Sequence, residues 1–383
     1  MTQKLYDIDS YIKEFDATVI SCEETDGKYT VILDNTAFFP EEGGQTCDAG
    51  TVDGIDVLHV AIKNNVIYHT LLSPLEVGKN VHCKIDFEHR YYNMQHHTGE
   101  HIISGIVHKL YGYENVGFHL SREDMTVDFS GELNREQLDE IEILANKAIY
   151  ECHNIRAYYP SPDKLSSISY RAKLDFYENV RIVDIEDIDM CACCAPHVKN
   201  TGEVGIIKIL DFMRYKGGIR LQAKCGLAAL LDYNKKYKEG YSISTTLSVK
   251  QDEIFGATKR LLETIDSYKS NMYKLKCEMR ELKLASLEYT DGNICLFEDN
   301  ADMNFIRSYV NEAVKKCGGM CGIFAGNDAD GYKYIVASEH IDLKEISAQM
   351  KDKLNSRGGG SSIMIQGSTC AFREQIEEFF KNN

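Results

Sequence analysis

The chain has 383 residues, of which 43% are hydrophobic and 27% charged, an ordinary composition for a globular protein. No apolar run approaches the roughly 18 residues of a membrane helix, and the start "MTQKLYDIDS" lacks the regions of a signal peptide, so we expect a cytoplasmic protein without membrane association. The net charge of −16 argues against nucleic-acid binding by the chain as a whole, because phosphate contacts need Lys and Arg. The length predicts two to four domains.

Residues 1–88 predict a small all-β barrel or sandwich. Short β-type segments such as "KYTVIL", "GIDVLHVAIK" and "NVHCKIDF" are separated by turn dipeptides at 26–27, 53–54 and 64–65. The segment "FFPEEGGQTCDAG" (38–50) interrupts this series, and it is too rich in glycine and acidic residues to be a strand.

Residues 89–235 predict an α+β domain. "YYNMQHHTGEHIISGIVHKLYG" has an apolar stripe at helical spacing that ends at Gly112, and "REQLDEIEILANKAIYECH" is a second amphipathic helix. "MTVDFS", "IRAYYP" and "VRIVDI" have the pattern of strands. The stretch 199–238 carries nine Lys/Arg against three Asp/Glu, which is typical either of a phosphate-binding patch or of a solvated face.

Residues 236–289 predict a long helix or a short coiled coil. Ser248 and Gln251 fit a capping box at its start. Apolar residues then recur at spacings of four and three from Leu261 to Leu282, which makes a heptad seam of about three heptads.

Residues 290–383 predict a small α/β domain. Strands are expected near "NICLFE", "CGIFAG", "KYIVAS" and "SIMIQG". Helices are expected near 303–316, 342–354 and 371–381.

Two short motifs predict a metal site. His97 and His101 are four apart on the first helix of the α+β domain, so they share a face and can reach one ion. Cys193 and His197 have a C-x₃-H spacing, and the proline between them makes this a turn. A His₃Cys set of this kind suits tetrahedral Zn²⁺. The 13 cysteines of a cytosolic chain are not expected to form a disulfide framework.

Other assignments of these residues are open. Cys191 or Cys194 could replace Cys193 as the thiolate ligand, and the same three cysteines could form a redox site. His108 lies two turns beyond the pair and His96 points elsewhere, so neither is expected to bind the ion.

A zincin protease is excluded by the order of residues in the helix. Its H-E-x-x-H motif places the general base directly after the first histidine. In this chain that position is Thr98, and the glutamate is Glu100.

The segments "FFPEEGGQTCDAG", "QHHTGEHIISGIV" and "CCAPHVKNTGEVGIIKIL" together resemble the editing domain of alanyl-tRNA synthetase and, more closely, the free-standing AlaX editing proteins. The heptad helix followed by "SRGGGSSIMIQGS" (356–368) resembles the DHHA1-type carboxy-terminal region of the synthetase. The resemblance runs from about residue 15 to the end and indicates the long AlaX form, without the aminoacylation domain. One departure is that Cys194 and Ala195 stand where the synthetase motif has glycines.

The resemblance implies a multidomain α+β protein. Its expected parts are a β-barrel domain with a Gly-rich loop (1–88), a zinc-binding editing domain of the type shared by threonyl- and alanyl-tRNA synthetases (89–235), a helical or coiled-coil linker (236–289) and a DHHA1-like α/β domain (290–383).

The implied function is trans-editing: hydrolysis of the ester in mischarged Ser-tRNA(Ala), with Gly-tRNA(Ala) as a second candidate substrate. A synthetase cannot reject a small extra hydroxyl by size alone, so a second hydrolytic sieve is needed. Zn²⁺ is the implied cofactor, on His97, His101, Cys193 and His197. Whether it is catalytic or structural stays open.

The resemblance also suggests residues of the substrate pocket. Gln45, on the turn of Gly43 and Gly44, is the candidate catalytic group, and the two glycines are candidate substrate-binding residues. His119 in "GFHLS" and Thr126 in "MTVDFS" are weaker substrate-binding candidates.

The implied partners are tRNA(Ala) mischarged with serine or glycine, and a second copy of the chain through the helical and carboxy-terminal region. Two other functions fit the residues: a non-catalytic zinc-containing tRNA-binding protein, and a thiol redox or metal-sensing protein.

Overall fold

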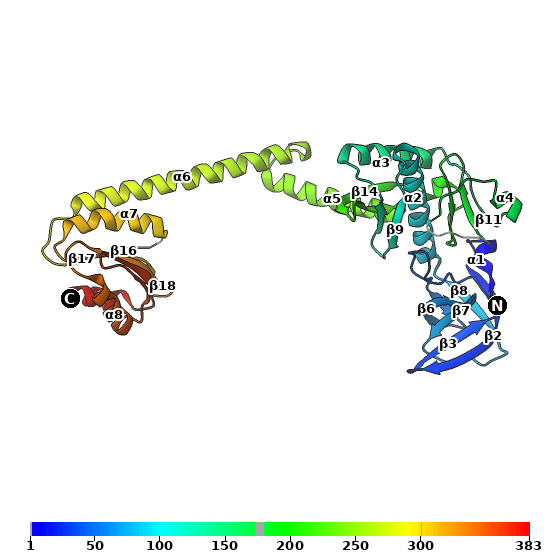
Figure 1. Cartoon of the computed structure of the whole chain (residues 1–383), viewed down its shortest axis with the longest axis horizontal. Helices are drawn as coiled ribbons and strands as arrows, with labels where there is room; N and C mark the ends of the chain where they lie inside the picture. The colour runs from blue at the N-terminus through cyan, green and yellow to red at the C-terminus, as the bar shows by residue number, and fades with distance from the viewer. Residues whose placement is uncertain (1, 173–179, 300) are drawn as a thin grey trace. The chain divides into compact units, whose positions relative to one another are not determined.

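The computed structural model describes residues 2–172, 180–299 and 301–383. It divides into two compact units, Met1–Ile243 and Ser244–Asn383, coloured blue to green and yellow-green to red in Figure 1. Within the described ranges, every helix is too short or too polar to cross a membrane.

Six antiparallel strands close into a barrel at the start of the first unit, in the order β2-β3-β7-β6-β5-β8. Their bounds are β2 (Glu14–Thr25), β3 (Lys28–Leu33), β5 (Gly50–Val52), β6 (Ile55–Lys63), β7 (Val66–Leu71) and β8 (Asn80–Ile85). Alternate side chains such as Val31, Val60 and Ile67 are fully buried inside it. Of the two predicted forms, the barrel is the one observed. The flanking elements are β1 (Gln3–Lys4), α1 (Leu5–Ile8) and β4 (Asn35–Thr36).

The three turn dipeptides form two-residue hairpins of the barrel. At 26–27, 53–54 and 64–65, both residues have positive φ values, between 50° and 77°. Turns with two such residues match the twist of the strands that they join, and Asn, Asp and Gly tolerate this conformation best. The predicted turns are confirmed.

One histidine lies inside the barrel. His69 is fully buried; its Nε2 lies 2.9 Å from the hydroxyl of Thr36, and its Nδ1 lies 3.2 Å from the carbonyl oxygen of Val31. Burial lowers the pKa of His69 from 6.5 to about 4, although the hydrogen bond to Val31 opposes this. The ring is therefore neutral in the folded protein at pH 7.

We expect His69 to make the fold less stable in mild acid. Between pH 6.5 and 4 the unfolded chain binds a proton that the folded ring does not, so the free energy of unfolding should fall as the pH is lowered through this window, by about 3 kcal/mol in all. Below pH 4 both states are protonated and the effect levels off. Urea unfolding at several pH values should give a flatter curve for His69→Gln than for the parent. Identical slopes would contradict the prediction.

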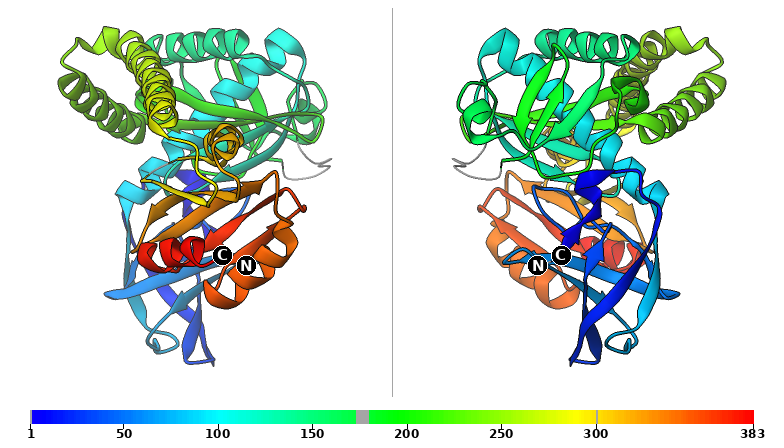
Figure 2. Two further views of the ribbon diagram at one scale, coloured as in Figure 1. Left: turned by 90° about the vertical axis from the view of Figure 1, so that its left-hand side faces the viewer. Right: turned by 90° about the vertical axis from the view of Figure 1, so that its right-hand side faces the viewer.

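A long helix, α2 (Phe87–Tyr111), leads from the barrel into the second half of the first unit (Figure 1). In both views of Figure 2 the blue barrel strands lie below the cyan and green elements of this unit. The carboxylate of Asp86 caps the helix by accepting from the backbone N–H of His89, and Gly112 ends it in a left-handed conformation with φ 67°. The predicted helix and its end are confirmed.

Two antiparallel sheets and a second helix pack around α2. One sheet has the order β14-β15-β10-β9 and the other β11-β12-β13. The second helix, α3 (Arg135–Tyr150), starts with a capping box between Asn134 and Gln137 and contacts α2. The remaining bounds are β9 (Asn115–Leu120), β10 (Met125–Phe129), β11 (Ile155–Tyr158), α4 (Pro162–Leu165), β12 (Ile182–Ile185), β13 (Asp189–Ala192), η1 (Thr201–Val204), β14 (Ile207–Tyr215) and β15 (Gly218–Cys225).

The helical region differs from its prediction at the start. Two helices occur, α5 (Gly226–Leu247) and α6 (Ile254–Ser286), separated by η2 (Gln251–Glu253). Ser248 has φ 54° and its N–H bonds to the carbonyl of Thr245, so it belongs to the turn after α5. The predicted capping box at Ser248 is wrong, because the left-handed conformation of this residue turns the chain, and α6 begins only at Ile254.

The second unit contains a five-stranded sheet in the order β16-β17-β18-β20-β19. One face carries α7, through buried Ile306 and Tyr309, and the other carries α8 and α9, through buried Met350 and Phe380. Among the described strands of this sheet, β16 and β17 pair in parallel and the other pairs are antiparallel, so the sheet is mixed rather than the parallel sheet of a simple α/β domain. The bounds are β16 (Ile294–Glu298), α7 (Met303–Ala313), η3 (Val314–Lys316), β17 (Met320–Asn327), β18 (Gly331–Ser338), α8 (Leu343–Lys353), β19 (Arg357–Gly360), β20 (Met364–Thr369) and α9 (Arg373–Lys381).

Candidate metal centre

Four side chains converge in the first unit, and their donor atoms all lie within 4.8 Å of one another: His97, His101, Cys193 and His197. The two histidines at 97 and 101 stand on successive turns of α2, and the other two residues lie in the loop after β13. Cys193 Sγ lies 3.5 Å from His97 Nε2 and 3.4 Å from His197 Nε2. Two ligands of one tetrahedral zinc ion, with Zn–S and Zn–N bonds of usual length, are about 3.6 Å apart. The spacing therefore fits such an ion.

Hydrogen bonds orient all three imidazoles. In each ring Nδ1 has an outer partner: Gln45 Oε1 for His97 at 2.8 Å, Asp189 Oδ2 for His101 at 3.0 Å, and Thr98 Oγ1 for His197 at 3.1 Å. The Nε2 atoms of His97 and His197 are turned toward Cys193 Sγ at the common centre. Ligands of a protein-bound metal are usually held in this way by a second layer of polar groups. The donor set and its orientation both suit Zn²⁺.

The electrostatics of the cluster suit ligands of an ion. Burial, together with the neighbouring His101 and His97, lowers the pKa of His197 well below its usual range, so its ring is neutral and able to bind metal. Burial raises the pKa of the Cys193 thiol well above its usual range, so an arriving ion must displace the thiol proton. Arg181 fixes the loop by donating from Nη1 to the carbonyls of Cys193 and Ala195, at 3.1 and 2.8 Å.

A second group of possible ligands shares His101 with the first and adds Asp189 and Cys191. The carboxylate of Asp189 is already bound by both Nε and Nη2 of Arg171, at 2.7 and 2.8 Å. Burial alone would raise the pKa of Asp189, but the hydrogen bonds from His101 and Arg171 lower it to about 2. The carboxylate thus serves as the partner of His101 and not as a separate metal site.

The Gly-rich turn reaches the cluster. Gly43 and Gly44 have φ of 65° and 83°, and a Cβ on Gly44 would lie 2.3 Å from the carbonyl oxygen of Phe118, so a side chain there is excluded by both conformation and space. The turn thereby buries Gln45, whose Oε1 accepts from His97. Among the described residues, Gln45 Nε2 has no hydrogen-bond partner.

The two weaker pocket candidates lie elsewhere. His119 on β9 and Thr126 on β10 are directly opposite each other and share one face of the sheet. Phe118, on the other face, packs its ring 4.7 Å from that of His97. Because side chains alternate along a strand, His119 and Thr126 point away from the metal cluster. The structure does not bring them to it.

His108 and His96, the two histidines of α2 that were not expected to bind the ion, have other partners. His108 is exposed and lies 3.0 Å from Glu114. The ring of His96 makes two hydrogen bonds. Its Nδ1 donates to the carbonyl of Tyr92, at 2.8 Å, and its Nε2 accepts from the backbone N–H of Cys225, at 3.1 Å.

The side chains that position the metal-ligand residues by hydrogen bonds were not identified from the sequence. These are Thr98, Arg171, Arg181 and Asp189. Thr98 is adjacent to a ligand in the sequence. The others carry no spacing signal, because backbone pairing between distant segments brings them to the site.

A cavity of about 350 Å³ opens onto the cluster, and His97, His101 and Cys193 form part of its wall. Gly43 of the Gly-rich turn and the two arginines at 171 and 181 also line it. This volume is within the range of about 300–1,000 Å³ that is typical of small-molecule sites.

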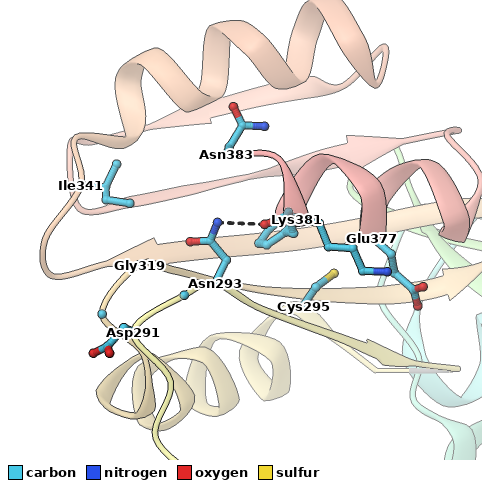
Figure 3. Close-up of a pocket in the computed structure, with 11 residues that line it drawn as sticks. Asp291, Asn293, Cys295, Gly319, Ile341, Glu377, Lys381 and Asn383 are labelled. Atoms are coloured by element: carbon cyan, nitrogen blue, oxygen red, sulfur yellow. Dashed lines mark hydrogen bonds between the residues drawn. The ribbon is translucent and has the colours of Figure 1, made fainter.

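A larger cavity, about 590 Å³, lies in the second unit (Figure 3). Asn293 braces its wall by donating to the carbonyl of Phe380 at 2.9 Å, and Cys295, Glu377 and Lys381 lie around it. Neither of the two metal-ligand groups found among the described residues is in this cavity. We assign it no site.

Comparison with known proteins matches two families. Residues 180–224 match the second additional domain of threonyl and alanyl tRNA synthetases, and residues 7–89 match the class II (A) tRNA synthetases. The chain is 28% identical to the alanyl-tRNA editing protein AlaX-L of Pyrococcus horikoshii, over 98% of this chain and 96% of that protein. It is 39% identical to AlaX-M of Methanosarcina mazei, over 55% of this chain and 90% of that one. It is also 29% identical to the alanine–tRNA ligase of Ignicoccus hospitalis, of which it covers 42%.

Proposed function

Because the chain belongs to the family of alanyl-tRNA editing proteins, we propose that it is a trans-editing hydrolase that deacylates mischarged tRNA(Ala). The observation that carries this proposal is the buried His₃Cys cluster beside a cavity of suitable size, in a chain that matches an editing protein over nearly its full length. The synthetase resemblance and the editing function expected from the sequence are thus supported by independent comparison.

The reaction is hydrolysis of the ester between the amino acid and the terminal ribose of the tRNA. When bound, Zn²⁺ would supply positive charge that polarises a carbonyl or a water molecule. His97, His101, Cys193 and His197 would hold it. Gln45 fixes the ring of His97 by a hydrogen bond, and Gly43 of the Gly-rich turn forms part of the cavity wall.

Serine is the proposed amino acid, with glycine as a second substrate. A pocket that pairs the serine hydroxyl leaves a buried polar group unpaired when alanine enters, which costs about 1–3 kcal/mol. The amide nitrogen of the buried Gln45, unpartnered among the described residues, is a group of the required kind, and Gln45 contacts His97 of the cavity wall. Gln45 is therefore the proposed contact for the substrate.

We expect Ser-tRNA(Ala) to be deacylated at least about 10-fold faster than Ala-tRNA(Ala) by the purified chain. The measurement follows loss of labelled amino acid from serine-, glycine- and alanine-charged tRNA(Ala). Equal rates on serine and alanine, or no hydrolysis of serine, would reject the editing function. Binding of tRNA without hydrolysis would instead support a non-catalytic tRNA-binding protein.

Residues 290–383 of the second unit are proposed to be the DHHA1-like part that the sequence resemblance implies, with residues 236–289 as the helical linker before them. The proposed boundaries of the first two domains stay at 1–88 and 89–235. The role proposed for the second unit is to contact the tRNA body, since an ester-linked serine looks alike on every tRNA.

The exposed face of α6 is proposed to pair with a second copy of the chain. Met272, Leu275 and Leu282 on this face are 55%, 59% and 73% exposed. The opposite side of the helix is used within the second unit, where Cys277 and Leu284 pack against its core. A heptad seam left exposed in this way favours a coiled-coil partner.

We expect Leu275→Glu to weaken dimerisation at least about tenfold, because it places a charge in the apolar seam. Analytical ultracentrifugation over a range of concentrations measures this. Ser270→Glu adds the same charge on the opposite face of α6 and is the control, with no change expected. A parent chain that is monomeric at all concentrations would refute the dimer.

A further inference from the structure

One buried carboxylate lines the cavity and takes no part in the metal cluster. Glu100 is 3% exposed and lies on α2 between His97 and His101. Its Oε1 accepts from the hydroxyl of Ser104, at 2.5 Å, and from the side-chain amide of Asn115. The amide oxygen of Asn115 is itself held by the N–H of Gly117, at 3.0 Å. The carboxylate is therefore fixed in orientation.

The second oxygen of Glu100 has no hydrogen-bond partner among the described residues. Oε2 lies 3.8 Å from Nε2 of His101, too far for a hydrogen bond. Glu100 is one of the residues that line the cavity, and its Oε2 lies beside His101 of the metal centre.

The charged neighbours of Glu100 are His101, 3.8 Å away, and Arg171. The two arginines of the cavity wall are already paired, Arg171 with Asp189 at 2.7 Å and Arg181 with Asp7 at 3.4 Å. In the described part of the chain, no Lys or Arg lies within 4 Å of Glu100. Since both arginines are already paired, the second oxygen of Glu100 is left to accept a hydrogen bond from a ligand, and a cationic donor gives the strongest such bond.

We propose that Glu100 binds the α-ammonium group of the aminoacyl ester. An aminoacyl ester carries one positive charge, on this amine, and its carboxylate is consumed in the ester bond. The inference rests on the proposed function, and it adds a selection: the cavity takes esters with a free amine and rejects those whose amine is acylated, such as peptidyl-tRNA.

The test measures binding of two analogues by the metal-replete full-length chain. The probes are 3′-deoxy-3′-(L-serylamino)adenosine, whose amide replaces the ester, and its N-acetyl form. Calorimetry should show the free-amine form binding at least about tenfold more tightly, as expected for a hydrogen bond between charged groups. Glu100→Gln should lose this preference by weakening the free-amine form alone. Glu100→Asp should keep part of it.

The possible outcomes distinguish the ammonium-binding role of Glu100 from the proposed editing function. If the parent binds both analogues equally, or if Glu100→Gln keeps the preference, the ammonium role is overturned while the editing function stands. If Glu100→Gln weakens both analogues equally or loses metal by elemental analysis, its role is structural and the proposal also falls. If the parent binds neither analogue, the proposed function itself fails at this cavity.

Discussion

The double variant His97→Ala/Cys193→Ala should reduce bound zinc from about one ion per chain to less than about one tenth. The physical reason is that it removes one ligand from α2 and one from the loop after β13, so neither half of the cluster is complete. Because metal binding also stabilises the fold around the ion, we expect the thermal midpoint of the first unit to fall as well. Elemental analysis of protein purified without chelators measures the metal content.

Matched variants of the same chemistry provide the control. His108→Ala removes an exposed histidine from the same helix, and Cys152→Ala removes an exposed thiol; both should keep full zinc. Cys191→Ala and Cys194→Ala address the other cysteines near the cluster and should also keep it. Full zinc in the double variant would show that the ligands are different residues.

Arg90→Met should lower the free energy of unfolding of the first unit by about 3–5 kcal/mol, because it leaves a buried carboxylate without its cation. Arg90 is fully buried on α2 and binds Asp48 with both Nε and Nη2. It also donates to the carbonyls of Ser10 and Ala37, at 2.9 and 2.5 Å. One side chain thus fastens the amino-terminal segment, the barrel and the end of the Gly-rich loop to the helix that carries the metal ligands.

Urea unfolding of Arg90→Met, Asp48→Asn and the double variant measures this coupling. The double variant should lose less stability than the sum of the two single variants. Arg135→Met breaks an exposed pair with Asp139 on α3 and should cost less than about 1 kcal/mol. Equal costs at Arg90 and Arg135 would contradict the anchoring role.

Much of the local structure could be predicted from the sequence, because local signals decide it. The turn dipeptides of the barrel adopt the left-handed conformations that Asn, Asp and Gly favour, and α2 ends at the glycine that was expected to end it. The start of α6 could not be predicted in this way. Ser248 has the residue type of a helix cap, but its backbone is used to turn the chain after α5.

In the candidate site, too, the features that local spacing decides could be predicted, and those that depend on distant segments could not. His97 and His101 share a helical face by spacing alone, and the C-x₃-H pair has matching ligand chemistry, so the cluster of four was foreseeable. Gln45 was expected in the pocket from the resemblance, but its hydrogen bond to His97 and the positions of Asp189 and Glu100 were not foreseeable, because strand register and loop packing decide which distant segments meet. The same reason explains His119: spacing gives the alternation along a strand but not which face is turned to the cluster.

The separation of the ligands along the chain has a consequence for biosynthesis. His97 and Cys193 are 96 positions apart, so a ribosome adding about 5–20 residues per second needs roughly 5–20 s to pass from one to the other. During that interval the histidine pair of α2 has been made but has no thiolate to complete it. Completion of the metal site is therefore a late event in synthesis, and a nascent chain released before Cys193 carries only the histidine pair of α2.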